Sequence, residues 1–544
     1  MRFSAFSDSL KKISYNRLRF VFLVLSGAFT GAMLVFTRFG FFEWITLVPA
    51  AVVLLFRGTD KKVRLRSLYF DGFAFFYTYY IVCFHWFVYL YPLEFIDGMT
   101  KSGALAVVLL AWFGLSLLQA LMGGFVFVIA GALFRCRLPQ KYTFIKIFVC
   151  SGLWAVYEWS QTLGWWGVPW GRLPIGQSHY IVGLQTASWF GSYFITFMLV
   201  AVNFLLAYAL VLHKEWRVAV IIAAAFLMFQ YVSGTLIWFG TDITSGKKMQ
   251  AACVQGNISS SDKWDSESNL KTEMVYKRLI SEAAEHGAEL VVLPETAFPY
   301  DLDSPSFSNL DEEFSVMSEK YGIYLLVGAF TAGDGSQSLN SLICYTPDGE
   351  RAKTVYSKRH LVPFGEYVPM RPIIETLFPP LADLVLSSDD VDAGEGTNVI
   401  DAGDIGLGGL ICFDSIYENL TYMSVRDGAK IICLSTNDSW FYDSAALYMH
   451  NAQAQLRAIE SGRYVVRSAN TGISTIISPR GEVISMLEPL VTGNLYGTVY
   501  ARENMTLYTL TGNSFVYVTG FFLLAIVCEN VISKLKNKNV NKKI

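Results

Sequence analysis

The sequence predicts a multi-pass α-helical membrane bundle joined to a large α/β domain outside the membrane. Two observations predict the bundle. The composition is apolar, with 53% hydrophobic and 15% aromatic residues among the 544, and the apolar residues gather in long runs. A third observation predicts the second domain, because residues 241–512 are more polar and alternate short β-rich runs with helical ones.

Eight apolar runs supply the membrane-spanning helices, since each provides close to the roughly 20 residues that a spanning helix needs. Seven runs lie in residues 1–240, and the eighth lies in residues 513–544 before a basic tail. No small-residue cleavage site follows the first run, so we expect an uncleaved anchor rather than a signal peptide. The runs lie near residues 20–37, 41–56, 68–91, 103–134, 144–165, 181–212, 218–239 and 515–532.

Basic residues occupy every second loop between these runs. They follow the second, fourth and sixth runs, for example at Arg57, Arg135 and Lys214. Because cytoplasmic loops carry an excess of Lys and Arg, we expect these loops, the N-terminus and the C-terminal tail to be cytoplasmic. Seven crossings then place residues 241–512 on the outer side of the membrane.

Several other classes of protein and site are not indicated. The eight cysteines form no CxxC pair and no Cys/His cluster with zinc-like spacing, so we expect neither a structural metal site nor a disulfide framework. No long basic stripe with interleaved aromatic residues is present, which argues against nucleic-acid binding.

Three chemically reactive residues lie at the ends of buried β-rich runs. Glu295 follows AELVVLP, Lys358 follows KTVYS, and Cys412 follows IGLGGLI. Each type of residue is by itself more often a solvated charge or a buried core cysteine, so the combination carries the argument. A carboxylate that takes the proton of a thiol, beside an ammonium that stabilises both anions, is a constellation for nucleophilic catalysis.

The run SKRHLVPFGEYVP, residues 357–369, resembles the signature of bacterial apolipoprotein N-acyltransferases. LPETAFP around Glu295, CFD at Cys412, TNDSWF from Thr436 and RAIESGRYVVRSANTGIS from Arg457 agree with that family in order and spacing. The resemblance covers the whole chain, including the membrane helices. It implies that the outer domain is a nitrilase-like α-β-β-α sandwich of the carbon-nitrogen hydrolase superfamily.

The resemblance also assigns the chemical roles. Cys412 is expected to be the acyl-accepting nucleophile, Glu295 its general base and later acid, and Lys358 a stabiliser of the oxyanion. One oxyanion donor contributes about 3 kcal/mol in comparable sites. The backbone N–H of Phe413 is expected to be a second donor.

Supporting residues follow from the same comparison of motifs. Glu366 is expected to tune Lys358, and Asn340 in SLNS belongs to the same constellation. Asp414 is expected to shape the site, although the family usually has Glu at this position and the side chain here is one methylene shorter.

Aromatic and apolar residues are expected to contact a lipid substrate. Trp264 matches a tryptophan that the family uses near the substrate. Trp440, Phe441 and the apolar stretch 377–386 are unusual on a soluble domain, which supports a lipid substrate. The resemblance implies that they form mobile arms over the active site. The alternative is that these side chains pack into the domain core.

The function implied by the resemblance is a ping-pong acyl transfer at a bacterial inner membrane. An acyl chain passes from a phospholipid to Cys412 as a thioester, then to the α-amino group of the diacylglyceryl-modified N-terminal cysteine of an apolipoprotein. This is the last step of lipoprotein maturation, and the catalytic domain is expected to be periplasmic. We expect a monomer in the lipid bilayer with no cofactor, because thiolate, base and oxyanion donors complete the chemistry.

Three alternatives compete with this interpretation. The same triad serves a membrane-tethered amidase or nitrilase that acts on a soluble C–N substrate. A Cys-His hydrolase would pair Cys412 with His360 or His450. A transporter or receptor would use the outer domain only to bind a ligand.

Overall fold

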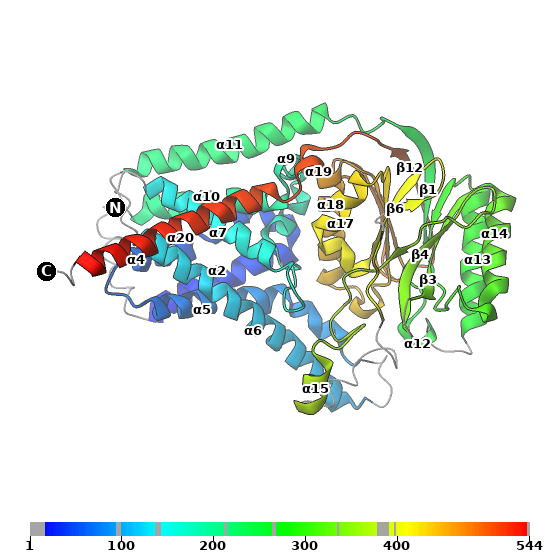
Figure 1. Cartoon of the computed structure of the whole chain (residues 1–544), viewed down its shortest axis with the longest axis horizontal. Helices are drawn as coiled ribbons and strands as arrows, with labels where there is room; N and C mark the ends of the chain where they lie inside the picture. The colour runs from blue at the N-terminus through cyan, green and yellow to red at the C-terminus, as the bar shows by residue number, and fades with distance from the viewer. Residues whose placement is uncertain are drawn as a thin grey trace. The chain divides into compact units, whose positions relative to one another are not determined.

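The computed structural model describes residues 17–93, 99–135, 143–211, 215–263, 268–333, 337–377, 391–396 and 399–540. The chain divides into two units. One is helical and comprises residues 1–85, 109–238 and 511–544. The other comprises residues 86–108 and 239–510 and holds both β-sheets (Figure 1).

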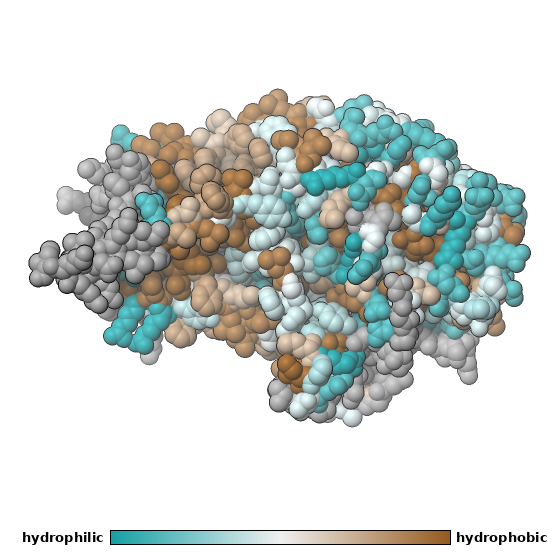
Figure 2. All heavy atoms as spheres, viewed as in Figure 1, coloured by the Kyte–Doolittle hydropathy of each residue, from teal (hydrophilic) through white to brown (hydrophobic). Residues whose placement is uncertain are grey.

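Helices lie on each of the eight apolar runs. Among the described residues, five segments are long and apolar enough to cross a membrane, namely 18–35, 37–59, 101–134, 192–211 and 216–240, and a shorter apolar helix covers 514–529. Hydrophobic residues also cover much of the visible face of this unit (Figure 2). The helices are α2 (Arg17–Val35), α4 (Val48–Thr59), α5 (Leu65–Cys83), α6 (Lys101–Phe134), α7 (Thr143–Ser160), α10 (Ser192–Val211), α11 (Trp216–Gly240) and α20 (Ser514–Val540).

The apolar run at 181–212 is not one continuous helix. It contains two short helices, α8 (Ile181–Leu184) and α9 (Ala187–Phe190), before α10 begins. Gly191 separates α9 from α10 with a φ of 78°, a conformation that glycine adopts without steric cost. Hydropathy alone does not reveal this break, because the run stays apolar on both sides of it.

Two six-stranded sheets form the core of the second unit. The first has the order β12-β1-β2-β3-β4-β5 and the second has the order β11-β10-β9-β8-β7-β6. The first sheet contains β1 (Lys247–Gln255), β2 (Leu290–Val292), β3 (Tyr324–Ala332), β4 (Ser338–Tyr345), β5 (Tyr356–Ser357) and β12 (Gly493–Ala501). The second contains β6 (Val399–Asp401), β7 (Gly406–Ile411), β8 (Ile431–Thr436), β9 (Val465–Ala469), β10 (Ser474–Ile477) and β11 (Val483–Leu487).

Helices cover the outer face of each sheet (Figure 1). Helices α13 (Asn269–Glu285) and α14 (Ser308–Tyr321) pack on the first sheet. Helices α17 (Glu418–Arg426) and α18 (Ala445–Ser461) pack on the second. The four layers form an α-β-β-α sandwich, which confirms the fold class predicted from the sequence.

Both faces of the central strands are apolar because one face packs against helices and the other packs against the opposite sheet. In β1, Ala252 and Val254 pack with Tyr276 of α13. Cys253 points the other way and packs between the sheets with Cys433 of β8. Successive residues of a strand face opposite sides, so a strand covered on both faces needs a continuous apolar run.

The parallel strands direct their carboxyl ends toward the candidate site. Strand β2 is parallel to β1 and β3, and β7 and β8 are parallel to each other. Glu295 lies just beyond β2, Cys412 directly follows β7, and Asn437 directly follows β8. Loops at the carboxyl ends of parallel strands are where α/β folds present functional groups.

Candidate active site

The backbone at Cys412 makes a sharp strand-to-helix turn. β7 ends at Ile411, and the 3₁₀ helix η7 (Cys412–Ile416) begins with Cys412. Cys412 has a φ of 48°, a left-handed conformation that costs about 1–3 kcal/mol for a non-glycine residue. Gly409 allows β7 to approach the first sheet here, because a Cβ atom at this position would lie 2.4 Å from Cγ of Tyr356. Such strain must be held by surrounding contacts, and it is typical of functional residues.

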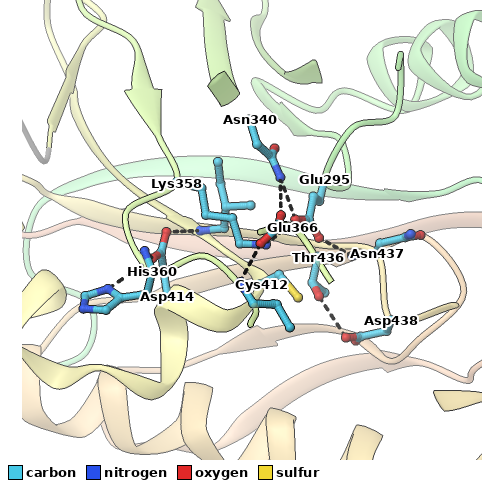
Figure 3. Close-up of polar contacts among 12 residues, drawn as sticks. Glu295, Asn340, Lys358, His360, Glu366, Cys412, Asp414, Thr436, Asn437 and Asp438 are labelled. Carbon is cyan, nitrogen blue, oxygen red and sulfur yellow. Dashed lines mark hydrogen bonds and ion pairs between the residues drawn. The ribbon is translucent and has the colours of Figure 1, made fainter. Parts of the chain in front are cut away.

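A buried ammonium lies between two carboxylates next to this turn. Nζ of Lys358 donates to Oε1 of Glu295 and to Oε1 of Glu366, each at 2.8 Å (Figure 3). Nδ2 of Asn340 donates to the same two oxygens, at 2.8 Å and 3.3 Å. Lys358 is only 2% exposed and Glu295 6%, so the ion pair lies largely out of solvent. The structure thus brings together four residues that the sequence places up to 71 positions apart.

The opposite charges of Lys358 and the two carboxylates shift one another's pKa values. Burial disfavours the charged forms of both partners, yet Lys358 and Asn340 hold the pKa of Glu295 below its usual value. Burial likewise opposes the ammonium, but Glu295 and Glu366 raise the pKa of Lys358 well above its usual value. Burial, with Glu295 nearby, raises the pKa of Glu366 despite its contact with Lys358. Glu295 is therefore the carboxylate that stays ionised and can accept a proton.

The thiol of Cys412 has the opposite tendency. Burial and the charge of Glu295 raise its pKa well above the usual value, while Lys358 and a hydrogen bond with Thr436 act in the other direction. A neutral thiol beside an ionised carboxylate is suited to general-base activation, in which the proton leaves as the sulfur attacks. The arrangement does not require a thiolate in the resting site.

Asp414 is fully buried and organises the chain around the turn. Its carboxylate accepts hydrogen bonds from the Tyr356 hydroxyl and the His360 backbone N–H, both at 2.8 Å. Asp414 therefore connects η7 to the segment that carries Lys358. Phe413, the neighbouring residue, is buried and its ring meets that of Tyr417 edge-on, with the centroids 5.5 Å apart.

Two further polar groups hold Glu295. The backbone N–H of Asn437 donates to Oε2 of Glu295 at 3.0 Å, and Nζ of Lys263 donates to the Glu295 carbonyl oxygen at 2.8 Å. Burial lowers the pKa of Lys263 to about 8, although Glu295 and Cys412 act to raise it. Neither residue was predicted from the sequence. Asn437 lies in the motif TNDSWF and directly follows a buried strand, and these two features were its signal in the sequence. Lys263, in the short helix α12 (Ser260–Lys263), had no such signal.

Comparisons with known proteins match both parts of the chain. The family model of the apolipoprotein N-acyltransferase N-terminal domain matches residues 26–205, and the carbon-nitrogen hydrolase model matches residues 250–503. An apolipoprotein N-acyltransferase of Geobacter metallireducens is 30% identical over 376 residues, which cover 67% of this chain and 70% of that protein. The chain belongs to the apolipoprotein N-acyltransferase family.

Other members of the apolipoprotein N-acyltransferase family match nearly the full length. The protein of Gloeobacter violaceus is 29% identical over 490 residues, 88% of each chain. That of Pasteurella multocida is 27% identical over 535 residues, 95% of this chain and 96% of that one. Together with the long apolar helices, the family identifies a membrane protein.

The residues expected to contact lipid are only partly described. Trp440 and Phe441 lie in the short helix η8 (Ser439–Phe441), directly after the loop that holds Asn437. The Phe441 ring meets that of Trp86 edge-on at 5.0 Å. Trp264 and residues 378–386 lie outside the described residues.

The two histidines of the Cys-His alternative make other contacts. The His360 ring stacks on Tyr417 at a centroid distance of 3.7 Å, and its Nδ1 lies 3.4 Å from the Asp414 carboxylate. His450 contacts the main-chain carbonyl oxygen of Cys412. These contacts favour Glu295 and Lys358, rather than either histidine, as the partners of the Cys412 thiol.

Proposed function

We propose that this protein transfers an acyl chain from a membrane phospholipid to the α-amino group of a diacylglyceryl-modified N-terminal cysteine on an apolipoprotein. Membership of the family and the names of its relatives support the reaction class. The observation that carries the proposal is the buried Glu295–Lys358 pair that acts on the Cys412 thiol. No cofactor is required, because these groups supply the base, the nucleophile and the oxyanion donor.

In the first half-reaction, Glu295 takes the thiol proton as the sulfur of Cys412 attacks the ester carbonyl of the phospholipid. The carbonyl oxygen becomes an oxyanion, which Lys358 and the backbone N–H of Phe413 stabilise. The tetrahedral intermediate then expels the alcohol oxygen of the lysophospholipid, which takes the proton from Glu295. A thioester on Cys412 and a lysophospholipid result.

In the second half-reaction, the amine of the lipoprotein attacks the thioester carbonyl and gives a proton to Glu295. The intermediate collapses to an amide, and the sulfur of Cys412 leaves and regains its proton from Glu295. An ester bond is thereby exchanged for an amide bond. Glu366 maintains the position and charge of Lys358, and Asn340 holds the carboxylates of Glu295 and Glu366 in place, through both halves.

The proposed placement follows from the loop charges and the family. Residues 1–240 form a seven-helix bundle, residues 241–512 form the periplasmic catalytic domain, and residues 513–544 form the last helix and a cytoplasmic basic tail. Both termini are then cytoplasmic, and the enzyme acts as a monomer at the outer leaflet of the inner membrane. Trp264, Trp440 and Phe441 are assigned to contacts with the acyl chains.

The test is acyl transfer by the purified full-length protein in detergent, with phospholipid and a peptide that starts with diacylglyceryl-cysteine. We expect an N-acylated peptide from wild type and from Cys528→Ala, which removes a cysteine that is exposed in the helical unit, and none from Cys412→Ala. Ammonia release from small amides without any acylated peptide would favour the tethered amidase. Acylated peptide from Cys412→Ala would contradict the proposal.

A further inference from the structure

A buried polar network lies against the main chain of Cys412. It contains Ser415, Asp438, His450 and Arg467, each at most 1% exposed. Asp438 lies in the loop after β8, His450 in α18 and Arg467 in β9. None of these side chains takes part in the chemistry described above, and charged side chains are rarely buried this completely without a structural or functional reason.

One end of the network holds the carbonyl group of Cys412. The Ser415 hydroxyl donates to this oxygen at 2.8 Å, and Nε2 of His450 lies 3.2 Å from it. Ser415 and His450 are also 2.8 Å apart. The carbonyl belongs to the residue whose backbone is in the strained left-handed conformation, so these contacts bear directly on the orientation of the nucleophile.

The other end of the network is the carboxylate of Asp438. It accepts from Nη2 of Arg467 at 2.6 Å and from the Thr436 hydroxyl at 2.8 Å, the latter drawn in Figure 3, and it lies 3.0 Å from Nδ1 of His450. Burial opposes its charge, but Arg467 and His450 hold the pKa of Asp438 well below the usual value. An ionised Asp438 therefore orients the His450 ring toward Cys412, as a carboxylate orients an imidazole in other enzymes.

Asp438 is also next in sequence to the residue that donates a hydrogen bond to Glu295. Asp438 has a φ of 54° and directly follows Asn437, whose backbone N–H donates to Glu295 at 3.0 Å. A Cβ atom at Gly472 would lie 2.7 Å from Cβ of Asp438, so the turn is closely packed from that side. One network thus touches the backbone of the nucleophile at one end and a hydrogen-bond donor of the base at the other.

We propose that Asp438, His450 and Arg467 form a positioning unit that holds the strained Cys412 backbone and the Asn437 amide in place. The Cys412 thiol and the Glu295 carboxylate thereby keep their relative positions during acyl transfer. The proposal rests on the function assigned above, but its effect on the thiol does not depend on the identity of the substrate. His450 acts through the main chain and exchanges no proton with the sulfur.

The test compares His450→Ala, His450→Gln and Ser415→Ala in the full-length protein. His286→Gln is the matched control, because that ring is exposed and stacks on Tyr496 away from the network. One measurement is the rate of Cys412 alkylation by iodoacetamide between pH 6 and 10, followed by mass spectrometry of its peptide. The other is the split between kcat and KM for phospholipid in the acyl-transfer assay.

We expect His450→Ala to lower kcat by about 100-fold, the loss typical of a misplaced reacting group, with KM within about twofold of wild type. His450→Gln offers an amide N–H to the Cys412 carbonyl, so it should recover at least about tenfold of that loss and keep the shape of the alkylation profile. Ser415→Ala, which leaves His450 in place, should lower kcat by about fivefold. The control should match wild type.

Two results would overturn the proposal, and a third would uphold it while rejecting the proposed substrates. The first overturning result is a folded His450→Gln that is as inactive as His450→Ala and has a shifted pH profile of Cys412 alkylation. It would show that His450 exchanges protons with the site. If kcat is unchanged in His450→Gln and Ser415→Ala, the network is only structural; these two milder variants decide the matter should His450→Ala fail to fold. Alkylation that slows in the variants while wild type acylates no peptide would uphold the positioning unit and reject the proposed substrates.

Discussion

Replacing Lys358 by methionine separates two effects of one ammonium. In the native site this group balances two carboxylates and, in the proposed mechanism, also stabilises the oxyanion. Oε1 of Glu295 and Oε1 of Glu366 each lie 2.8 Å from the same Nζ, so they are at most twice that distance, about 5.6 Å, apart. At an effective dielectric constant of about 20, two charges at this separation repel by about 3 kcal/mol.

That repulsion and the burial of both groups raise the pKa at which the second carboxyl loses its proton, so one of the two carboxylates should hold a proton at neutral pH in Lys358→Met. The thiol also loses the cation that favours its ionised form. We therefore expect Cys412 alkylation at pH 7 to slow markedly. Acyl transfer should fall by about 100-fold or more, because a single oxyanion donor is worth about 3 kcal/mol.

The double variant Lys358→Met/Glu366→Gln removes the competing carboxylate, so Glu295 stays ionised, without restoring the donor. We expect its alkylation rate at pH 7 to return toward the wild-type rate while acyl transfer stays low. Thermal unfolding of each purified variant verifies that the fold is intact. Recovery of acyl transfer together with alkylation would show that Lys358 only balances charge. Unchanged alkylation in Lys358→Met would show that the ammonium does not control the ionisation of the site.

Three further predictions concern the surroundings of the triad. Asp414→Glu adds a methylene to a fully buried site and should destabilise the protein by about 1–3 kcal/mol, measured by thermal unfolding; an unchanged melting temperature would contradict this. Lys263 has a pKa of about 8 when folded and about 10.4 when unfolded, so the unfolded chain binds more protons between these values. Stability should therefore rise with pH from about 8 to 10 in wild type relative to Lys263→Met, and parallel curves would contradict the shifted pKa. Gly328→Ala places a Cβ atom 2.2 Å from the Pro294 carbonyl oxygen and should displace Glu295, which lowers kcat; full activity would show that the loop adapts.

The sequence predicts the parts of the site that lie at the ends of apolar runs or inside a long motif. Glu295, Lys358 and Cys412 each follow a β-rich run, and the structure places each of them just after a strand. Glu366 was predicted as a site residue from the motif alone, and the structure shows its hydrogen bond with Lys358. The pattern of apolar strands covered on both faces predicted an α/β domain, and the two-sheet sandwich was implied by the resemblance to the family.

Other parts of the site depend on contacts between distant segments. His450 was considered as a base for Cys412, but its position relative to the thiol and the main chain is set by how α18 packs on the second sheet. Asp438 and Arg467 are 29 positions apart and meet because β8 and β9 are neighbours. Lys263 resembles any surface lysine in sequence, and only the structure shows that it is buried against Glu295.

Acylation of Cys412 is tested most directly by the intact mass of the purified protein after incubation with a phospholipid of a single acyl-chain type. We expect wild type to gain the mass of one acyl group, to lose it in hydroxylamine, and to carry it on the peptide that contains Cys412. Cys412→Ala should gain no mass under the same conditions. A wild-type protein that stays unmodified, or an acyl group that persists in Cys412→Ala, would contradict the assignment of Cys412 as the acyl-accepting nucleophile.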